Sequence, residues 1–472
     1  MNFASSRQLA EALGRGLPAD RLVIDPDVLA AMSHDDAEWA PVGQAAVGVR
    51  ARSEAEVQHV VSVCAELGAP VVPRGSGTGL SGGANATDGC VVLDVSRMNK
   101  VLEIDRDNLI CVVQPGIVNN DLKAEVAEFG LWYPPDPASA PWSSIGGNVN
   151  TNAGGLCCLK YGVTRDYVLG LRAVTGGPAG AYGTVTRLGR RTSKGVAGLD
   201  LTALFVGSEG TLGVVTEVTL RLRPALTGTP RTVVGAFTDL PTAGEAVSII
   251  TSRGLAPSML ELLDRSCLEA VEEWKHLGLE ADAYALLLAR VDTPGESGSL
   301  EAEAVAEAMK DAGLRASGKT LWTELSSDEV EAEALFEARR LAYPALERLG
   351  PVLTEDVCVP RSKVPQMLAQ VDGIGKKHGV QIATIAHAGD GNLHPLLVTP
   401  PGDDAARVAA QAAFEEFLDA AIALGGTVTG EHGIGLLKRD GMRRELDPGA
   451  LAMQDAIRKT LDPLEIFNPG KG

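Results

Sequence analysis

The feature that most constrains the fold is a run of five glycines within residues 73–83, Pro-Arg-Gly-Ser-Gly-Thr-Gly-Leu-Ser-Gly-Gly. Each glycine adds to the entropy lost on folding, so such a run is kept where backbone approaches a ligand closely or takes positive φ. The N–H groups of such a loop form a concave anion site, which favours a phosphate. A G-x-G-x-x-G pattern is present, but a Rossmann loop opens directly into a helix. Here a turn-rich string and an expected strand at 90–95 follow, which predicts a dinucleotide loop in a different architecture.

The charge and composition of the chain narrow the classes of partner. The chain carries 61 acidic and 42 basic residues, a net charge of −19. Nucleic acids and anionic membranes are bound through basic surfaces, so we expect neither as the main partner. No run reaches the roughly 18 apolar residues of a membrane span, and the first residues lack the apolar core of a signal peptide. Seven cysteines without a C-x-x-C pair favour a cytoplasmic protein with reduced thiols and no iron–sulfur ligands of its own.

Two further glycine-rich segments follow, at 142–155 and 207–213. The first of them carries amide side chains at every second position between paired glycines: Asn148, Asn150 and Asn152. A surface linker would explain the glycines alone, but linkers rarely carry so regular a series, so we interpret the segment as ligand-lining. The glycine motifs cease after residue 224, which predicts a domain boundary near 225.

Local signals indicate mixed helices and strands on both sides of that boundary. Ser53-x-x-Glu56 is a capping box that opens a helix, and Gly68 ends it. Beyond 225, expected strands at 232–237, 283–291 and 382–386 alternate with acidic, alanine-rich helices. This alternation predicts an α+β domain with its helices on one face of a sheet.

Two histidines flank a turn signal in His387-Ala-Gly-Asp-Gly-Asn-Leu-His394. Asp390-Gly391 is typical of a two-residue hairpin turn. If it forms the turn, the two histidines pair directly, with Cβ atoms roughly 4.5–5.5 Å apart. A lone histidine is more often a core residue, but a cross-strand pair at this separation suits one divalent metal ion.

The segment Gly430-Glu-His-Gly-Ile-Gly435 supplies groups that the histidine pair lacks. Glu431 would complete a set of two histidines and one carboxylate with open positions, which is typical of catalytic sites. His432, beside a metal-bound substrate, would be the general base. The glycines let adjacent side chains converge, where a regular strand would point them apart. The alternative is a flexible turn with solvent-exposed polar groups.

Taken together, these motifs resemble the FAD-linked oxidases of the vanillyl-alcohol oxidase type. Within that family the chain is similar to the branch of glycolate oxidase FAD subunits, D-lactate dehydrogenases and D-2-hydroxyglutarate dehydrogenases. The resemblance runs from about residue 40 to the last residue. The motifs that carry it occur in order at 73–79, 146–155, 160–164, 207–213, 387–394, 430–435 and 468–471.

The resemblance implies an α+β fold, with a two-subdomain FAD-binding domain of the vanillyl-alcohol oxidase type and an α+β cap domain over the flavin. The implied parts are the FAD-binding domain at 41–224, a cap carrying substrate and metal at 225–440, and a segment at 441–472 that returns to the FAD-binding domain. Residues 1–40, which precede the resemblance, are expected to form a helical lead-in. Berberine-bridge-type relatives attach flavin to a histidine in the glycine loop; this loop has none, so non-covalent FAD is expected. The implied FAD-binding residues are Pro73, Arg74, Gly75, Ser76, Gly77, Thr78, Gly79, Ser81, Pro135, Asp136, Ser143, Gly146, Gly147, Asn150, Asn152, Gly154, Gly155, Tyr161, Gly162, Glu209, Gly213, Val214 and Asn468.

The resemblance also implies a reaction, the oxidation of a small D-2-hydroxy acid to the 2-keto acid. In this branch a divalent metal is held by positions matching His387, His394 and Glu431, with zinc expected first and manganese or iron as alternatives. The position matching His432 takes the hydroxyl proton, and the Cα hydride passes to flavin N5. The substrate-binding positions are Arg339, Tyr343, Asn392 and His432, and the resemblance implies that Arg339 and Asn392 hold the substrate carboxylate.

One position departs from the relatives that act on 2-hydroxyglutarate. These carry a lysine two residues before an Asp-x-x-x-Pro element, where Thr354 stands here, and a threonine where Tyr343 stands. A missing cation and a bulkier neighbour favour D-lactate or glycolate. Arg361 or Lys363 could supply a cation instead, so D-2-hydroxyglutarate stays an alternative substrate.

The electron acceptor is left open among a quinone, an electron-transfer flavoprotein, a partner subunit and oxygen. A location at the inner membrane face through such a partner, and a homodimer, stay open too. Two other classes compete with the oxidoreductase. A metallohydrolase using only the His–Glu–His site would leave the glycine segments unused. A flavin-binding scaffold subunit of an oxidase complex, inactive by itself, would keep the glycine segments but should lose the metal ligands.

Overall fold

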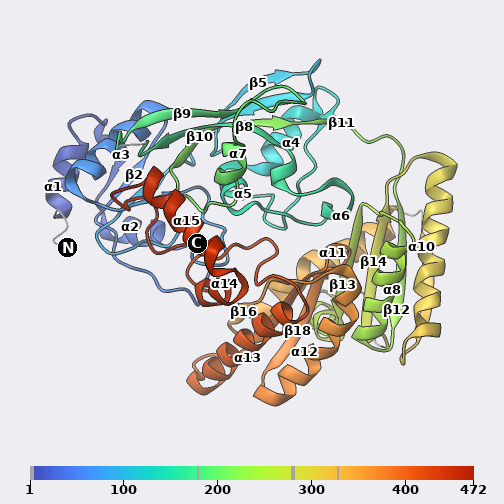
Figure 1. Ribbon diagram of the computed structural model, residues 1–472. Coiled ribbons are helices and arrows are strands. Elements are labelled where there is room, and N and C mark those ends of the chain that lie inside the picture. The colour runs from blue at the N-terminus through green and yellow to red at the C-terminus, as the bar shows by residue number, and fades with distance from the viewer. Residues whose placement is uncertain (1–4, 178–179, 278–281, 327–328) are drawn as a thin grey trace. The chain divides into compact units, whose positions relative to one another are not determined.

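The computed structural model describes residues 5–177, 180–277, 282–326 and 329–472 (Figure 1). The chain divides into two compact units, and neither is contiguous in sequence. The first unit consists of Met1–Gly154, Val163–Ala225 and Glu431–Gly472. The second consists of Gly155–Gly162 and Leu226–Gly430. The polypeptide therefore leaves the first unit twice and returns to it twice, at Val163 and at Glu431.

The first unit contains two main sheets, each with its own apolar cluster. In one sheet the last three strands are parallel, and the order is β1 (Leu22–Val23), β2 (Val47–Arg50), β4 (Val91–Asp94), β3 (Val71–Arg74). The other is antiparallel, with the order β5 (Val101–Asp105), β6 (Ile110–Val113), β10 (Val214–Arg221), β8 (Val168–Thr175), β9 (Thr184–Gly189). Two short strands, β7 (Leu131–Trp132) and β11 (Arg223–Pro224), pair separately.

The helix predicted after Ser53 forms with the expected bounds, as α3 (Glu54–Leu67). The Ser53 side chain accepts the N–H of Glu56 at 3.3 Å, and Gly68 ends the helix at φ 64°, in the left-handed region that glycine adopts without strain. The capping box is only half formed, because the Glu56 carboxylate binds the Arg21 guanidinium and the Arg52 N–H instead of the N–H of Ser53. The other helices of this unit are α1 (Ser6–Leu13), η1 (Ala19–Arg21), α2 (Pro26–Met32), α4 (Asn119–Ala127), α5 (Ile145–Thr151), η2 (Thr164–Asp166), α7 (Leu201–Phe205), α14 (Arg439–Glu445) and α15 (Pro448–Leu461).

The last residues of the chain are built into the first unit. Phe467 forms a parallel bridge with Val71 of β3. The Lys471 ammonium donates to the carbonyl of Asn85 at 2.5 Å, and its residue is 1% exposed. Burial lowers the pKa of Lys471 to about 8, because the charged form loses its hydration. The sheet that carries the glycine loop is therefore completed by the end of the chain.

The second unit is built on one eight-stranded sheet. Its order is β15 (Thr320–Ser326), β12 (Arg231–Phe237), β14 (Ala285–Val291), β13 (Met259–Asp264), β18 (Gln381–His387), β19 (Asn392–Val398), β16 (Val352–Thr354), with β17 (Val357–Cys358) also on β19. All pairings are antiparallel. The helices are α6 (Cys158–Tyr161), α8 (Leu240–Ser252), α9 (Arg265–Lys275), α10 (Gly295–Arg315), α11 (Glu329–Glu347), η3 (Arg361–Lys363), α12 (Val364–His378) and α13 (Asp404–Ala423).

Helices cover both faces of this sheet, so the prediction of helices on one face is wrong. Val234 and Ala236 of β12 belong to one apolar cluster with Phe336 of α11. A side chain at Gly235, between them, would meet Met309 of α10 on the opposite face. The central strand β14 is buried at all positions but one, which is the pattern of a strand covered on both sides.

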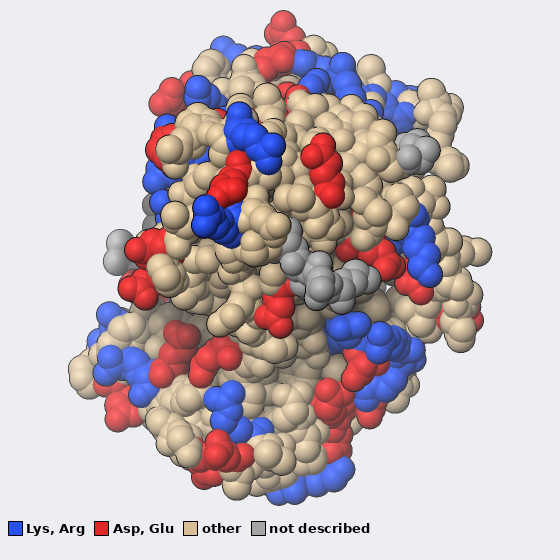
Figure 2. All heavy atoms as spheres, turned by 90° about the vertical axis from the view of Figure 1, so that its left-hand side faces the viewer, with Lys and Arg blue, Asp and Glu red and all other residues tan. Residues whose placement is uncertain are grey.

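Surface charge, helix hydrophobicity and the cysteines add three observations to the description of the fold. On the face drawn in Figure 2, acidic and basic side chains are interspersed. Within the described residues, no helix combines the length and the apolar character needed to cross a membrane. The seven cysteines all lie in the described ranges and remain thiols.

Candidate functional site

The two predicted metal-binding histidines lie on neighbouring strands, β18 and β19, of the second unit. His387 pairs with Asn392, so the predicted direct pairing of His387 with His394 is wrong. Two overlapping turns, in which the N–H groups of Asp390 and Gly391 donate to the carbonyls three residues earlier, make the loop four residues long instead of two. The register therefore differs by two residues from the one that the Asp-Gly pair predicts.

Gly391 gives the physical reason for the longer loop. It takes φ 83° in the left-handed region. A Cβ at this position would run into the carbonyl oxygen of Val359, whose N–H in turn donates to the Gly391 carbonyl at 2.9 Å. The turn is thus set by packing against a distant segment, which the dipeptide alone does not reveal.

We expect Gly391→Ala to destabilise the protein by about 2 kcal/mol or more, since a left-handed non-glycine residue costs about 1–2 kcal/mol before the contact with Val359 is added. Gly402→Ala is the matched control, because Gly402 has φ 76° and no atom of the described residues within 4 Å of its added Cβ. The measurement is the midpoint of urea unfolding for both variants. Equal shifts would show that the Val359 contact has no role.

The corrected register still brings the two histidines together. Because paired residues share a face and side chains alternate along a strand, His387 and His394 are diagonal neighbours on one face of the sheet. Their ring centroids are 5.2 Å apart, with the rings nearly perpendicular at 86°. Both residues are buried, at 4% and 3% exposed. One small ion can therefore be reached by both imidazoles.

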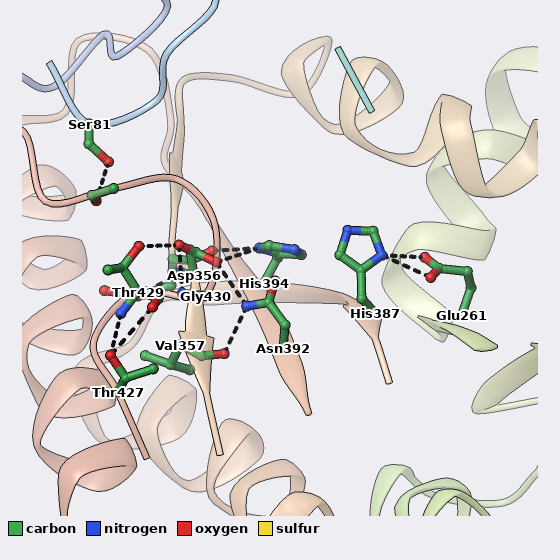
Figure 3. Close-up of polar contacts among 12 residues, drawn as sticks. Ser81, Glu261, Asp356, Val357, His387, Asn392, His394, Thr427, Thr429 and Gly430 are labelled. Atoms are coloured by element: carbon green, nitrogen blue, oxygen red, sulfur yellow. Dashed lines mark hydrogen bonds and ion pairs between the residues drawn. The ribbon is translucent and has the colours of Figure 1, made fainter. Parts of the chain in front are cut away.

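The second ring nitrogen of each histidine faces an acceptor (Figure 3). His387 Nδ1 lies 2.8 and 3.0 Å from the two carboxylate oxygens of Glu261. His394 Nδ1 lies 3.2 Å from the carbonyl oxygen of Glu355. These acceptors place the proton on Nδ1, so that Nε2 of each ring carries the lone pair. Histidines that bind metal in proteins are oriented in this way.

A buried carboxylate, Asp356, orders the chain next to the histidines. Its Oδ1 accepts from the Asn392 amide at 2.8 Å, and its Oδ2 accepts from the Thr429 hydroxyl at 2.6 Å and the Gly430 N–H at 3.1 Å. The Asn392 amide nitrogen also donates to the carbonyl of Val357 at 3.1 Å. Both hydrogens of this amide are therefore used within the protein, and Gly430 is held at the point where the second unit ends.

Glu431 and His432 follow Gly430 directly, and two groups of candidate metal ligands include them. Ligand atoms of His387, His394 and Glu431 all lie within 4.8 Å of one another. The same holds for Asp356, His394 and His432, so the two groups share His394. Two imidazoles with one carboxylate suit zinc, manganese or iron, so the residues present fit a divalent metal ion.

The predicted substrate-binding side chains of the second unit lie on α11 and β16. Arg339 of α11 is 5% exposed, with Nε 2.9 Å from Glu261 Oε2. The Nε–H is not aimed along this line, so the contact is an ion pair without a hydrogen bond. Tyr343 lies one turn further along α11 and is partly buried. Thr354 pairs with Leu396, which places it on the face of His394, and its buried hydroxyl has no hydrogen-bond partner among the described residues.

The predicted phosphate loop leaves β3 in the first unit and packs against the second glycine segment. A Cβ at Gly75 would run into the Ser144 hydroxyl, and one at Gly79 would lie 3.0 Å from Asp35 Oδ2. The Arg74 guanidinium donates to the carbonyl of His34 at 2.6 Å. Burial raises the pKa of Asp35 and lowers that of Arg74. Close packing thus explains two of the glycines without a ligand.

The central part of the second glycine segment forms the short helix α5. Ser144 caps its first turn, and Asn152 ends it at φ 53°. Asn150 donates to Gly146 within the helix at 2.7 Å and accepts the N–H of Gly210 at 3.0 Å. This amide, which we predicted to line the ligand, therefore ties the second glycine segment to the third.

Other predicted cofactor residues have structural partners as well. The Asn152 side chain accepts the N–H of Arg165 at 2.9 Å. Ser143 accepts from the Asn148 amide at 3.2 Å. Asp136 forms an ion pair with Lys123. These side chains therefore hold neighbouring segments of the fold together. The contacts do not involve the backbone N–H groups that a phosphate would use.

Glu209 joins the third glycine segment to the last part of the chain. It takes φ 51°, and its buried carboxylate accepts the N–H groups of Ile434 at 2.6 Å and Gly435 at 2.9 Å. Burial raises the pKa of this carboxyl, although the two N–H groups oppose the effect. The Glu209 carbonyl accepts from the Asn468 amide at 2.6 Å, and that amide also donates to Gly83 at 2.8 Å. The three glycine segments and residue 468 therefore meet in the first unit.

Two buried polar atoms in this region suit a polar cofactor. The Ser208 hydroxyl and Asn468 Oδ1 have no hydrogen-bond partner among the described residues. A Cβ at Gly147 would meet only the Ser144 hydroxyl, at 3.3 Å. Such orphaned groups beside open backbone are what a dinucleotide would satisfy, so the segments fit FAD. Ser208 lies inside the third predicted segment, but the sequence did not single out its hydroxyl.

Three predicted cofactor residues, Gly155, Tyr161 and Gly162, lie in the second unit, while the others lie in the first. The Tyr161 hydroxyl donates to Asp292 at 2.5 Å, and Lys160 forms an ion pair with the same carboxylate. Through these two contacts with Asp292, the segment Gly155–Gly162 is held in the second unit although it is distant from the rest of that unit in sequence.

Two carboxylates that contact predicted site residues, Glu261 and Asp356, were not among the residues predicted from the sequence. Both are fully buried, at 0% exposed. The signal for Glu261 was available, because it is the one charged residue inside the apolar stretch Met-Leu-Glu-Leu-Leu of β13. A charge in a buried strand is costly unless it is paired, which marks it as a residue with a specific partner.

Two family profiles match the chain. The profile of FAD linked oxidases, C-terminal domain, matches residues 229–472. The profile of the FAD binding domain matches residues 45–185. Together they confirm the predicted family.

Curated relatives and solved structures agree with these matches. The glycolate oxidase subunit GlcD of Bacillus subtilis is 42% identical to this chain, and the match covers 89% of this chain and 87% of the GlcD sequence. The D-lactate dehydrogenase of Anaerostipes hadrus is 32% identical, over 96% of this chain and 94% of its own. The structure of p-cresol methylhydroxylase superimposes with a TM-score of 0.81 at 17% identity, over 98% of this chain and 96% of that one, which confirms the predicted fold class. This chain therefore belongs to the FAD-linked oxidase family.

Proposed function

We propose that the protein oxidises a small D-2-hydroxy acid, D-lactate or glycolate, to the 2-keto acid, using non-covalent FAD and a divalent metal ion. The observation that carries this proposal is the pair of buried histidines, His387 and His394, whose Nδ1 atoms face acceptors in a chain of the FAD-linked oxidase family. Relatives named as a glycolate oxidase subunit and a D-lactate dehydrogenase support the substrate class.

The first unit would hold FAD along its three glycine segments, 73–83, 142–155 and 207–213. Backbone N–H groups of the loop after β3 would meet the pyrophosphate. The orphaned Ser208 hydroxyl and Asn468 Oδ1 would meet polar atoms of the cofactor. When bound, FAD supplies the acceptor for a hydride from the substrate Cα.

The second unit and the residues directly after it would hold the metal and the substrate. His387, His394 and Glu431 would be the metal ligands. A bound divalent ion makes a coordinated hydroxyl more acidic. His432 would take the proton from the 2-hydroxyl oxygen of the substrate, and Arg339 would pair with its carboxylate. Asn392 donates both amide hydrogens within the protein, so in this arrangement it leaves the substrate carboxylate to Arg339.

Thr354 and Tyr343 favour a monocarboxylic substrate. A second, distal carboxylate would need a cation, and burying it unpaired costs several kcal/mol. Thr354 supplies a hydroxyl without a hydrogen-bond partner among the described residues but no charge. We therefore place D-2-hydroxyglutarate second, to be reached only if Arg361 or Lys363 provides the cation.

We expect purified protein to be yellow and to be bleached without oxygen by D-lactate or glycolate faster than by D-2-hydroxyglutarate. The order of the rates follows from the missing cation at position 354, and L-lactate should be the control that does not react. The measurement is the rate of flavin reduction against concentration of each acid. Preference for the five-carbon diacid would contradict the argument from Thr354.

The same experiment separates the competing classes. A colourless protein would favour a metallohydrolase, and a yellow protein that no 2-hydroxy acid bleaches would favour a flavin-binding scaffold. For the electron acceptor we favour a partner subunit, because the GlcD relatives are named as subunits of glycolate oxidase.

A further inference from the structure

We propose that Glu261 is a positioning residue that sets both the metal-ligating His387 and the substrate-binding Arg339. This inference rests on the proposed function, which names the roles of those two residues. Neither the resemblance nor the motifs in the sequence assign Glu261 any role.

The backbone puts Glu261 in place before any side chain is considered. β13 and β18 are antiparallel, and Glu261 pairs directly with His387. Residues that pair directly share a face of the sheet, so the carboxylate and the imidazole start out side by side. Glu261 is 0% exposed, and its neighbours in the strand are apolar leucines.

The carboxylate then contacts two groups at once. Both of its oxygens lie within 3.0 Å of His387 Nδ1, and Oε2 lies 2.9 Å from Arg339 Nε. A buried carboxylate without a partner would be strongly destabilising. Here the Arg339 guanidinium supplies the opposite charge, and the His387 N–H supplies a hydrogen bond. The three side chains form one network inside the second unit.

This network has a chemical consequence for each partner. A carboxylate on Nδ1 fixes the tautomer and turns the ring, and it makes Nε2 a better electron-pair donor. The two histidines differ in this contact, because His394 Nδ1 lies 3.2 Å from the Glu355 carbonyl and 3.8 Å from Asp356 Oδ1, so its carboxylate neighbour is beyond hydrogen-bond distance. Because Glu261 faces Nε of Arg339, it orients the other end of the guanidinium, whose planar fork suits a carboxylate.

The test is Glu261→Gln, which keeps the shape and removes the charge. We expect zinc affinity, measured by competition with a chelator, to fall about 10- to 100-fold, the usual effect of losing such a partner. We also expect KM for D-lactate to rise, because Arg339 is no longer held. FAD content should not change, since no predicted FAD segment includes position 261.

Asp264→Asn is the matched control. Asp264 is a buried carboxylate three residues further along the same strand, and it accepts from the N–H groups of Cys267 and Thr384. Its replacement should lower stability without changing zinc affinity or KM. An equal loss of zinc affinity in both variants would reduce Glu261 to a general structural role and overturn the proposal.

A second variant guards against loss of folding. Glu261→Gln leaves the Arg339 charge buried without its carboxylate, whereas Glu261→Gln combined with Arg339→Gln leaves no charge in the network. The double variant should still bind zinc more weakly than the protein with Arg339→Gln alone. If Glu261→Gln binds zinc as tightly as the wild-type protein, the role of Glu261 is overturned and the proposed function stands. If the wild-type protein binds no divalent metal, both the proposed function and the role of Glu261 are overturned.

Discussion

Replacing His387 by alanine is expected to abolish turnover while FAD remains bound. The imidazole is one of three predicted metal ligands, and its removal leaves His394 and Glu431 alone. A divalent site with two protein ligands holds its ion far more weakly than one with three. The predicted FAD segments lie in other parts of the sequence, so the yellow colour should persist. The measurements are metal content, flavin absorbance and the rate of bleaching by D-lactate.

His378→Ala is the control for this variant. His378 is also a histidine of the second unit with a carboxylate partner, since its Nε2 lies 2.7 Å from Glu416. It belongs to neither group of candidate ligands. It should therefore keep metal and activity. Flavin loss from His387→Ala, with His378→Ala unaffected, would count against the assignment of FAD to the first unit.

His432→Ala should keep the metal and lose most of its activity. Removal of a general base typically lowers the rate by about 10²- to 10⁴-fold. Whether the variant keeps its metal is the decisive observation, because His432 also belongs to the second group of candidate ligands, with Asp356 and His394. The measurements are zinc affinity and the rate of flavin reduction.

The two alanine variants together decide which group holds the ion. If the metal lies on His387, His394 and Glu431, only His387→Ala releases it. If it lies on Asp356, His394 and His432, only His432→Ala releases it, and the general base must be sought elsewhere. His394→Ala, which belongs to both groups, should release the metal in either case and serves as the positive control.

Local signals were enough to predict much of the secondary structure. Ser53 and Gly68 bound α3 where they were expected, because a cap and a left-handed glycine act within one turn. The strand expected at 232–237 forms as β12, Arg231–Phe237. The grouping of the glycine segments in the first unit was also predictable, since their compositions require the same kind of environment.

Features that depend on distant contacts were not predictable in the same way. The register of the hairpin is decided at Gly391 by the carbonyl of Val359, which lies more than thirty positions earlier in the sequence. The amides of the second glycine segment recur at period two, yet they lie in a helix, and Asn150 serves to hold Gly210. In each case a partner far along the chain sets the structure, and the local pattern does not reveal that partner.

Because each unit is built from separate segments of the sequence, the two units are completed at different times during synthesis on the ribosome. The long stretch of the second unit, Leu226–Gly430, is continuous, and its partner Gly155–Gly162 is already made when it emerges. The first unit, in contrast, cannot be completed until residues 467–471 have been synthesised, because Phe467 pairs with Val71 and Lys471 donates to Asn85. Domains fold largely in the order in which they are completed. We therefore expect the histidine-bearing unit to form first during translation, with the earliest-made sheet of the protein finished last.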